Sequence, residues 1–299
     1  MKLNNLLNEY YSSFDFNTLR SETKAQYQYF LSVSLTTDVK TLKHLTVLGD
    51  IDFSKVTTKI AKLCYEKWCE KGIHMANHVL SVTRILFNYA IHMEYCEINP
   101  FSNIKRRTPE ARKVVWAKED VKKFLDVSYS EFKYRSIGLI VHMAYEWCQR
   151  LGDMRTLTWE SLDLENKKAH ITQSKRRAEV FLPISDDLND MLKTQQEDFG
   201  FQKYVAPRPK PIRGLYEAYS LTKLPFIGRQ VMNLAGISTN LRLSDLRRTG
   251  TTEMVDAGVS MGNIMSVTGH ANPQSVKPYM KNTFTSASLA LNKRKNLTD

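Results

Sequence analysis

Residues 267–280 read VTGHANPQSVKPYM, and this stretch indicates more than any other what kind of domain the chain forms. It places His270 directly after a glycine and Tyr279 nine residues later. Neither residue would indicate a function alone, because a histidine beside a turn and a half-buried tyrosine both occur in ordinary protein cores. Their significance depends on three further segments that precede them.

Those three segments carry charged residues that a plain helical core would not need. QRLGDMRTLTW contains Arg150, and SDLRRTGTT contains Arg247. Between them, ITQSKRRAEVFLPI has β-compatible runs on either side of a polar centre, which predicts a hairpin with Lys175 at its turn. Taken singly, each residue has a structural explanation, such as capping a helix or occupying a solvated turn. The ordered set of Arg, Lys, Arg, His and Tyr indicates a common site instead.

In this order the segments resemble the catalytic domain of tyrosine recombinases, also called phage integrases. The resemblance runs from about Trp116 to Lys293 and includes the family's usual nine-residue step from histidine to tyrosine. The first half is similar to the family's helical core-binding domain, because IDFSKVTTKIAKLCYEKWCEKG, a long helix and NPF follow that domain's usual course. The resemblance implies a site-specific DNA recombinase that cuts and rejoins DNA through a 3′-phosphotyrosine intermediate, for integration or excision of a phage or other mobile element.

The resemblance also implies a role for each matching residue. Tyr279 is the expected nucleophile. Arg150 and Arg247 are expected to hold the scissile phosphate, since planar guanidinium forks suit the charge on its oxygens. Lys175 is the expected acid that protonates the departing 5′-oxygen, and His270 is expected to bind a phosphate oxygen or to assist proton transfer. No metal or other cofactor is expected.

One position departs from the family's pattern. The second arginine segment usually begins with histidine, occasionally lysine, whereas this chain has Ser244. A serine hydroxyl can hydrogen-bond a phosphate but is a poor proton acceptor near neutral pH, so we expect slowed or altered proton transfer. Removing one acid–base contributor typically lowers a rate by ~10²–10⁴. The departure keeps open a second hypothesis, a DNA-binding regulator that no longer cuts.

The pattern of elements predicts a mainly α-helical protein. Residues 1–104 are expected to form a helical, SAM-like core-binding domain, whose clearest helix runs from about His74 to Tyr95. Residues 105–115 are basic and poor in apolar side chains, which predicts an exposed linker. Residues 116–299 are expected to form a mostly helical catalytic domain with a small antiparallel three-stranded sheet. Its strands are expected at 162–164, 169–172 and 179–184.

The charge of the chain favours a polyanionic partner. Lys and Arg number 43 against 31 Asp and Glu, which gives a net charge of +12. Double-stranded DNA fits this surplus, because cations that neutralise phosphates release condensed counterions. On the long helix a polar stripe either faces solvent or lies against DNA. With the basic linker it supplies the residues predicted to contact DNA, which are Asn77, Ser81, Arg84, Lys105, Arg106 and Arg107.

Further expectations concern partners and location. The resemblance implies a homotetramer on DNA, a monomer or weak oligomer without it, and leaves open whether a DNA-bending protein or an excisionase takes part. The four cysteines fit no zinc pattern and are expected to be reduced thiols. The sequence shows neither a signal peptide nor an apolar run that could span a membrane, so a cytoplasmic protein acting at the nucleoid is expected.

The two ends of the chain also carry expectations, and the resemblance leaves one alternative role open. About fifteen residues precede the first clear helical pattern, so the simpler two-domain form, without the additional arm-binding domain that many integrases carry, is expected. The C-terminal segment Phe284–Lys295 either docks on a neighbouring protomer, as in the family, or forms a frayed tail. A chromosome- or plasmid-dimer resolvase would use the same residues, so the sequence does not separate that role from an integrase.

Overall fold

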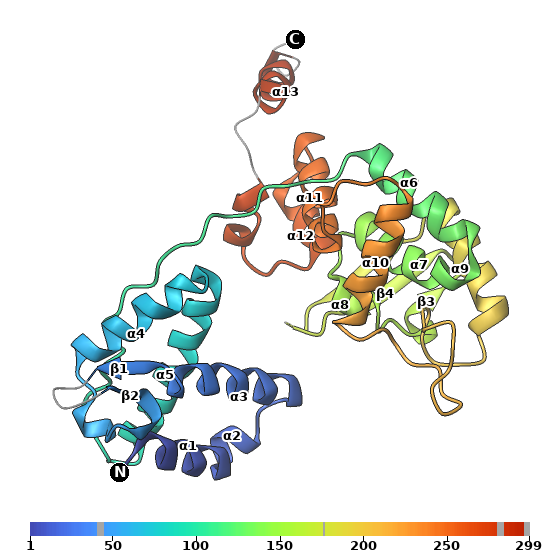
Figure 1. Ribbon diagram of the computed structural model, residues 1–299. Coiled ribbons are helices and arrows are strands. Elements are labelled where there is room, and N and C mark those ends of the chain that lie inside the picture. Colours follow the sequence, from blue (N-terminus) through green and yellow to red (C-terminus); the bar gives the residue numbers. More distant parts are fainter. Residues whose placement is uncertain (41–44, 176, 280–283, 296–299) are drawn as a thin grey trace. The chain divides into compact units, whose positions relative to one another are not determined.

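The computed structural model describes residues 1–40, 45–175, 177–279 and 284–295. The chain divides into two compact units, Met1–Arg112 and Lys113–Asp299. The first is coloured blue to teal in Figure 1 and the second green to red. In the described residues no helix is long and apolar enough to cross a membrane.

The first unit is a helical bundle built around α5, Ile73–His92. Apolar residues recur along this helix at spacings of three and four, so that Val79 and Leu86 are fully buried. The helix packs chiefly against α3 and α4. The remaining helices of this unit are α1 Leu3–Ser12, α2 Phe14–Asn17, α3 Ser21–Leu35 and α4 Thr58–Glu70, with single 3₁₀ turns at Leu48–Asp50 and Phe53–Lys55.

A short hairpin in this unit was not predicted from the sequence. Strands β1, Asp38–Lys40, and β2, Leu45–Val47, pair in antiparallel fashion with Val39 opposite Thr46. Each strand has three residues, which is too short for an apolar–polar alternation to be recognised. The hairpin buries Val39 against the helices, so it extends the core of the bundle.

The second unit surrounds α7, Phe132–Glu146. This helix is buried along most of its length and contacts four other helices of more than ten residues. Those helices are α6 Lys118–Ser130, α9 Asp186–Phe199, α10 Lys223–Leu234 and α11 Leu246–Asp256. The shorter helices are α8 Leu151–Met154, α12 Met261–Thr268 and α13 Phe284–Lys295. Single 3₁₀ turns lie at Trp159–Ser161, Leu243–Asp245, Pro273–Ser275 and Lys277–Tyr279.

The sheet of this unit has three antiparallel strands in the order β3-β4-β5. They are β3 Leu162–Asp163, β4 Lys168–Thr172 and β5 Glu179–Pro183. Ala169 pairs with Leu182 and Ile171 with Val180, and all four side chains are buried in the core. The prediction of a mainly helical fold with a small antiparallel three-stranded sheet is therefore confirmed.

Candidate active site

Arg150 is delivered to the site by an unusual helix end. At the C-terminus of α7 the Cys148 amide donates to the Tyr145 carbonyl and the Gln149 amide to the Ala144 carbonyl, which is a Schellman turn. Cys148 occupies the left-handed position of that turn with φ 51°, where glycine is the usual residue. The chain therefore reverses sharply, and Arg150 is the N-cap residue of the short helix α8.

Two neighbours hold the guanidinium of Arg150. Its Nη1 donates to Gln173 Oε1 at 2.9 Å and lies 3.7 Å from Asp153 Oδ2. Asp153 is buried, and its other carboxylate oxygen accepts hydrogen bonds from the amide and hydroxyl of Ser174. The first arginine is thus connected to the β4–β5 turn, in which Lys175 also lies.

Arg247 lies in the first turn of α11, and most of its side chain is buried. Its Nη2 donates to the Thr268 carbonyl at 2.8 Å and lies 3.2 Å from His270 Nε2. Burial lowers the pKa of this guanidinium, and the positive charge of Arg150 lowers it further. Its Nη1 is buried and has no hydrogen-bond partner in the described part of the chain. Two cations and an unsatisfied donor in one place favour an anionic ligand.

The hydrogen bonds of Thr268 define the tautomer of His270. The Thr268 hydroxyl lies 2.7 Å from the Ile264 carbonyl and 2.7 Å from His270 Nδ1. A hydroxyl has one proton, and the carbonyl can only accept, so the proton points to Ile264. Nδ1 must then carry a proton and donate to Thr268. In the neutral ring Nε2 is left with its lone pair, facing Arg247.

Tyr279 ends a 3₁₀ turn beside this histidine. The ring centroids of Tyr279 and His270 are 6.2 Å apart. The guanidinium of Arg248 stacks over the Tyr279 ring, 5.1 Å from its centroid. The structure therefore brings Arg247, His270 and Tyr279 together, with Arg150 joined to them through Gln173 and Thr268. Sequence reasoning did not single out Arg248, whose only signal is its place next to Arg247.

The other two predicted residues lie at the edge of this cluster. Lys175 is exposed at the β4–β5 turn, and among the described residues its ammonium makes no hydrogen bond with the cluster. Ser244 is exposed in the 3₁₀ turn that precedes α11. Sequence reasoning also missed the buried polar residues behind the cluster, Asp153, Gln149, Gln173 and Thr268.

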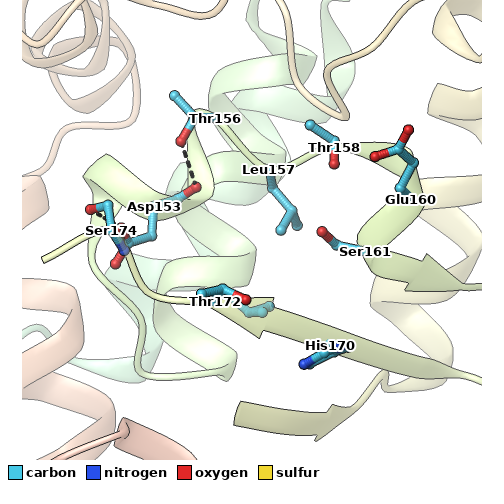
Figure 2. Close-up of a pocket in the computed structure, with 10 residues that line it drawn as sticks. Asp153, Thr156, Leu157, Thr158, Glu160, Ser161, His170, Thr172 and Ser174 are labelled. Carbon is cyan, nitrogen blue, oxygen red and sulfur yellow. Dashed lines mark hydrogen bonds between the residues drawn. The ribbon is translucent and has the colours of Figure 1, made fainter. Parts of the chain in front are cut away.

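A pocket lies next to the cluster on the other side of Asp153. Figure 2 shows it between β4 and the segment that follows α8. Its labelled polar side chains are mostly hydroxyls and carboxylates, and none is an arginine or lysine. The carboxylates of Asp153 and Glu160 disfavour a phosphate there, so the arginine cluster is the better candidate for an anion site. Within the described ranges no three His, Cys, Asp or Glu side chains gather as metal ligands would.

In the first unit, the predicted DNA-contacting residues hold the following segment of their own chain. Asn77 accepts a hydrogen bond from the Tyr65 hydroxyl (2.7 Å) and donates to the Arg107 carbonyl (2.8 Å). The same tyrosine hydroxyl accepts from the Arg107 amide. Ser81 Oγ accepts from Arg106 at 2.8 Å. The basic side chains of this segment are exposed, and they are Lys105, Arg106 and Arg107.

Arg84 makes the same kind of contact with an earlier part of that segment. Its guanidinium donates to the carbonyls of Phe101 and Ile104. The Asn99 amide donates in turn to the Arg84 carbonyl and to Asn88 Oδ1. The polar stripe of α5 therefore fastens residues 99–107 to the bundle. Sequence periodicity alone did not reveal this role.

Comparison with known proteins identifies the family and similar folds. Residues 115–286 match the phage integrase family. A tyrosine recombinase of Pseudothermotoga lettingae is 21% identical over 258 residues, which cover 81% of this chain and 84% of that protein. A Tn1549 transposon integrase in complex with circular intermediate DNA has a similar fold, with a TM-score of 0.76 at 16% identity over 98% of this chain and 99% of that one. A lambda integrase dimer bound to a COC′ core site gives 0.75 at 15% identity over 95% and 97%.

Proposed function

Because the chain belongs to the phage integrase family of tyrosine recombinases, we propose that it integrates or excises a phage or other mobile element, with Tyr279 as the nucleophile. The observation that carries the assignment of the site is Arg247. It is a mostly buried guanidinium with one unsatisfied nitrogen, beside a second arginine and next to His270 and Tyr279. A scissile phosphate would satisfy that nitrogen and both positive charges.

In the proposed reaction, the Tyr279 oxygen attacks the phosphorus of a DNA phosphodiester. A tyrosyl–phosphorus bond forms as the bond to the 5′-oxygen breaks. Arg150 and Arg247 stabilise the charge on the non-bridging oxygens, and Lys175 gives a proton to the departing 5′-oxygen. His270 Nε2, which has its lone pair in the neutral tautomer, accepts the tyrosine proton and, once protonated, can donate a hydrogen bond to a phosphate oxygen. A 5′-hydroxyl from another strand reverses these steps and rejoins the DNA.

We propose double-stranded DNA as the partner and a homotetramer as the active assembly. A lambda integrase of similar fold has been solved as a tetramer bound to a Holliday junction, with a TM-score of 0.74. The net charge of +12 supports DNA as the ligand. Binding should weaken steeply with salt, because phosphate contacts release counterions.

The decisive experiment is covalent trapping on a nicked suicide duplex made from the DNA that flanks the gene. The wild type should give a protein–DNA adduct on a denaturing gel, and Tyr279→Phe should give none. Tyr216→Phe is the matched control, since Tyr216 is another half-buried tyrosine, and it should react like the wild type. Salt-sensitive binding without an adduct in the wild type would refute the proposal.

Ser244 favours one alternative, a DNA-binding regulator that does not cut. It is exposed where the family usually has histidine, so this chain lacks that proton carrier. The same gel decides between the two, because a regulator would bind the duplex without forming an adduct. Ser244→His should raise the cleavage rate by ~10²-fold or more if the missing group limits proton transfer.

A further inference from the structure

Gln173, the residue immediately after β4, hydrogen-bonds to Arg150, to Gln149 and to the Thr268 carbonyl. We propose that Gln173 is a positioning residue, which holds Arg150 in place against the segment that carries His270. This inference rests on the proposed function, because it concerns the same site. Gln173 is 0% exposed, so its amide has no access to water and must be satisfied by the protein.

The side-chain amide of Gln173 uses both of its ends. Its Oε1 accepts from Arg150 Nη1 at 2.9 Å. Its Nε2 donates to Gln149 Oε1 at 2.7 Å and to the Thr268 carbonyl at 2.8 Å. That carbonyl also accepts from Arg247. One amide therefore joins the first arginine to the backbone atom that orients the second.

The backbone of Gln173 closes the turn that carries Lys175. Its amide donates to the Ala178 carbonyl at 2.8 Å, and its own carbonyl accepts from the Arg177 amide at 3.0 Å. The buried side chain and the turn are thus fixed by one residue. A shift of Gln173 would displace Lys175 and Arg150 together.

The chain segment before His270 is packed tightly onto this amide. Gly269 adopts φ +67°, and a Cβ at this position would lie 2.5 Å from Gln173 Nε2. Real Cβ atoms do not approach so closely, so Gly269 allows the backbone to contact Gln173 directly. The position of His270, one residue later, therefore depends on where Gln173 lies.

A neutral amide suits this task better than a second carboxylate would. An amide oxygen orients the guanidinium of Arg150 through a hydrogen bond but does not cancel its charge. The Asp153 carboxylate already lies 3.7 Å from Arg150 Nη1, so a second carboxylate would neutralise the guanidinium further and compete with the scissile phosphate. The amide thus holds the arginine in position and leaves more of its charge available to an anion.

The experiment compares Gln173→Met with Gln195→Met in the full-length protein. Gln195 is a matched control, because it is also 0% exposed, accepts from Arg135 Nε and donates to Ser136 and the Val205 carbonyl. Both variants lose the same kind of buried hydrogen bonds, but only Gln173 touches the site. The single-turnover rate of cleavage at saturating suicide duplex, the Kd for DNA and the melting temperature are measured for each.

We expect Gln173→Met to lower the saturating cleavage rate by ~10- to 100-fold, because small displacements of a positioned group have effects of this size. The Kd for DNA should change little. Gln195→Met should show a similar loss of melting temperature and a wild-type rate. Equal rates for the two variants would overturn the inference. Gln173→Glu keeps the shape of the side chain and should also slow cleavage, because its carboxylate pairs with Arg150. A wild-type cleavage rate for this variant would contradict the inference.

A crystal structure of Gln173→Met tests the positioning without relying on chemistry. The inference requires the Arg150 guanidinium or residues 268–270 to move by about 1 Å or more. It is overturned if both keep their places. A wild type that forms no adduct would refute the proposed function alone, and the crystal structure would still decide the role of Gln173.

Discussion

The close contact between Gly269 and Gln173 leads to a prediction about stability. Gly269→Ala places a methyl group in a left-handed position with φ +67°, where its Cβ would lie 2.5 Å from Gln173 Nε2 and 2.9 Å from its Cδ. Gly236 provides the matched control, since it also follows a helix, has φ +65° and has nothing within 4 Å of an added Cβ. The two substitutions therefore share the backbone strain and differ in the steric clash.

The expected magnitudes follow from those two contributions. The left-handed conformation costs an alanine about 1–2 kcal/mol, which applies at both positions. At Gly269 the clash must also displace a fully buried glutamine and break its hydrogen bonds, at about 1–3 kcal/mol more. Gly269→Ala should therefore lower the free energy of unfolding by about 2–5 kcal/mol, against about 1–2 kcal/mol for Gly236→Ala.

Urea unfolding followed by tryptophan fluorescence measures this difference. Three of the four tryptophans, Trp116, Trp147 and Trp159, lie in the unit 113–299 and report on it. Gly269→Ala should also slow cleavage, while Gly236→Ala should not. If the losses of unfolding free energy caused by Gly269→Ala and Gly236→Ala differ by less than ~0.5 kcal/mol, the claim that Gly269 is held against Gln173 is refuted.

Thr268→Val removes the hydroxyl that accepts from His270 Nδ1, so the ring loses one of the two contacts that orient it. Cleavage should slow by ~10-fold or more in single-turnover assays, and an unchanged rate would contradict the assignment. Burial raises the pKa of the Cys148 thiol to about 11 and that of Cys64 to about 12. Both thiols therefore stay protonated at pH 8 and should resist iodoacetamide until the protein unfolds, as mass spectrometry would show; rapid labelling of the folded protein would be inconsistent with the burial. Arg84→Met removes two hydrogen bonds to carbonyls and should lower the free energy of unfolding of the unit 1–112 by about 1–3 kcal/mol. The fluorescence of the single tryptophan in this unit, Trp68, measures the change. An unchanged stability would mean that these bonds do not hold residues 99–107 to the bundle.

The sheet could be predicted from the sequence because its signals are local. Buried Ala169, Ile171, Val180 and Leu182 alternate with polar or exposed residues, and polar turns separate the strands, so the predicted strands agree with the observed ones to within a residue or so. The hairpin of the first unit carried no such signal, since its strands are too short to establish a period.

The buried polar residues could not be predicted, because their roles depend on distant parts of the chain. Gln173 contacts Gln149 and Thr268, which lie 24 and 95 residues away in sequence. A glutamine at the end of a strand looks like any solvated turn residue until the fold encloses it. Arg150, His270 and Tyr279 could be singled out because their order and spacing match a family pattern, whereas no such pattern marked the residues that hold them.

If both units bind one DNA molecule, as proposed, the polar stripe of α5 also affects how strongly they bind it together. Residues 99–107 are fastened to the bundle, so the tether between the units can be no longer than 108–115, which is eight residues. Releasing them would lengthen it to 99–115, or seventeen residues. Effective concentration falls roughly as the −3/2 power of tether length, so the second unit would meet DNA at about one third of its former local concentration. Asn77 and Arg84 would then influence avidity for DNA without touching a phosphate.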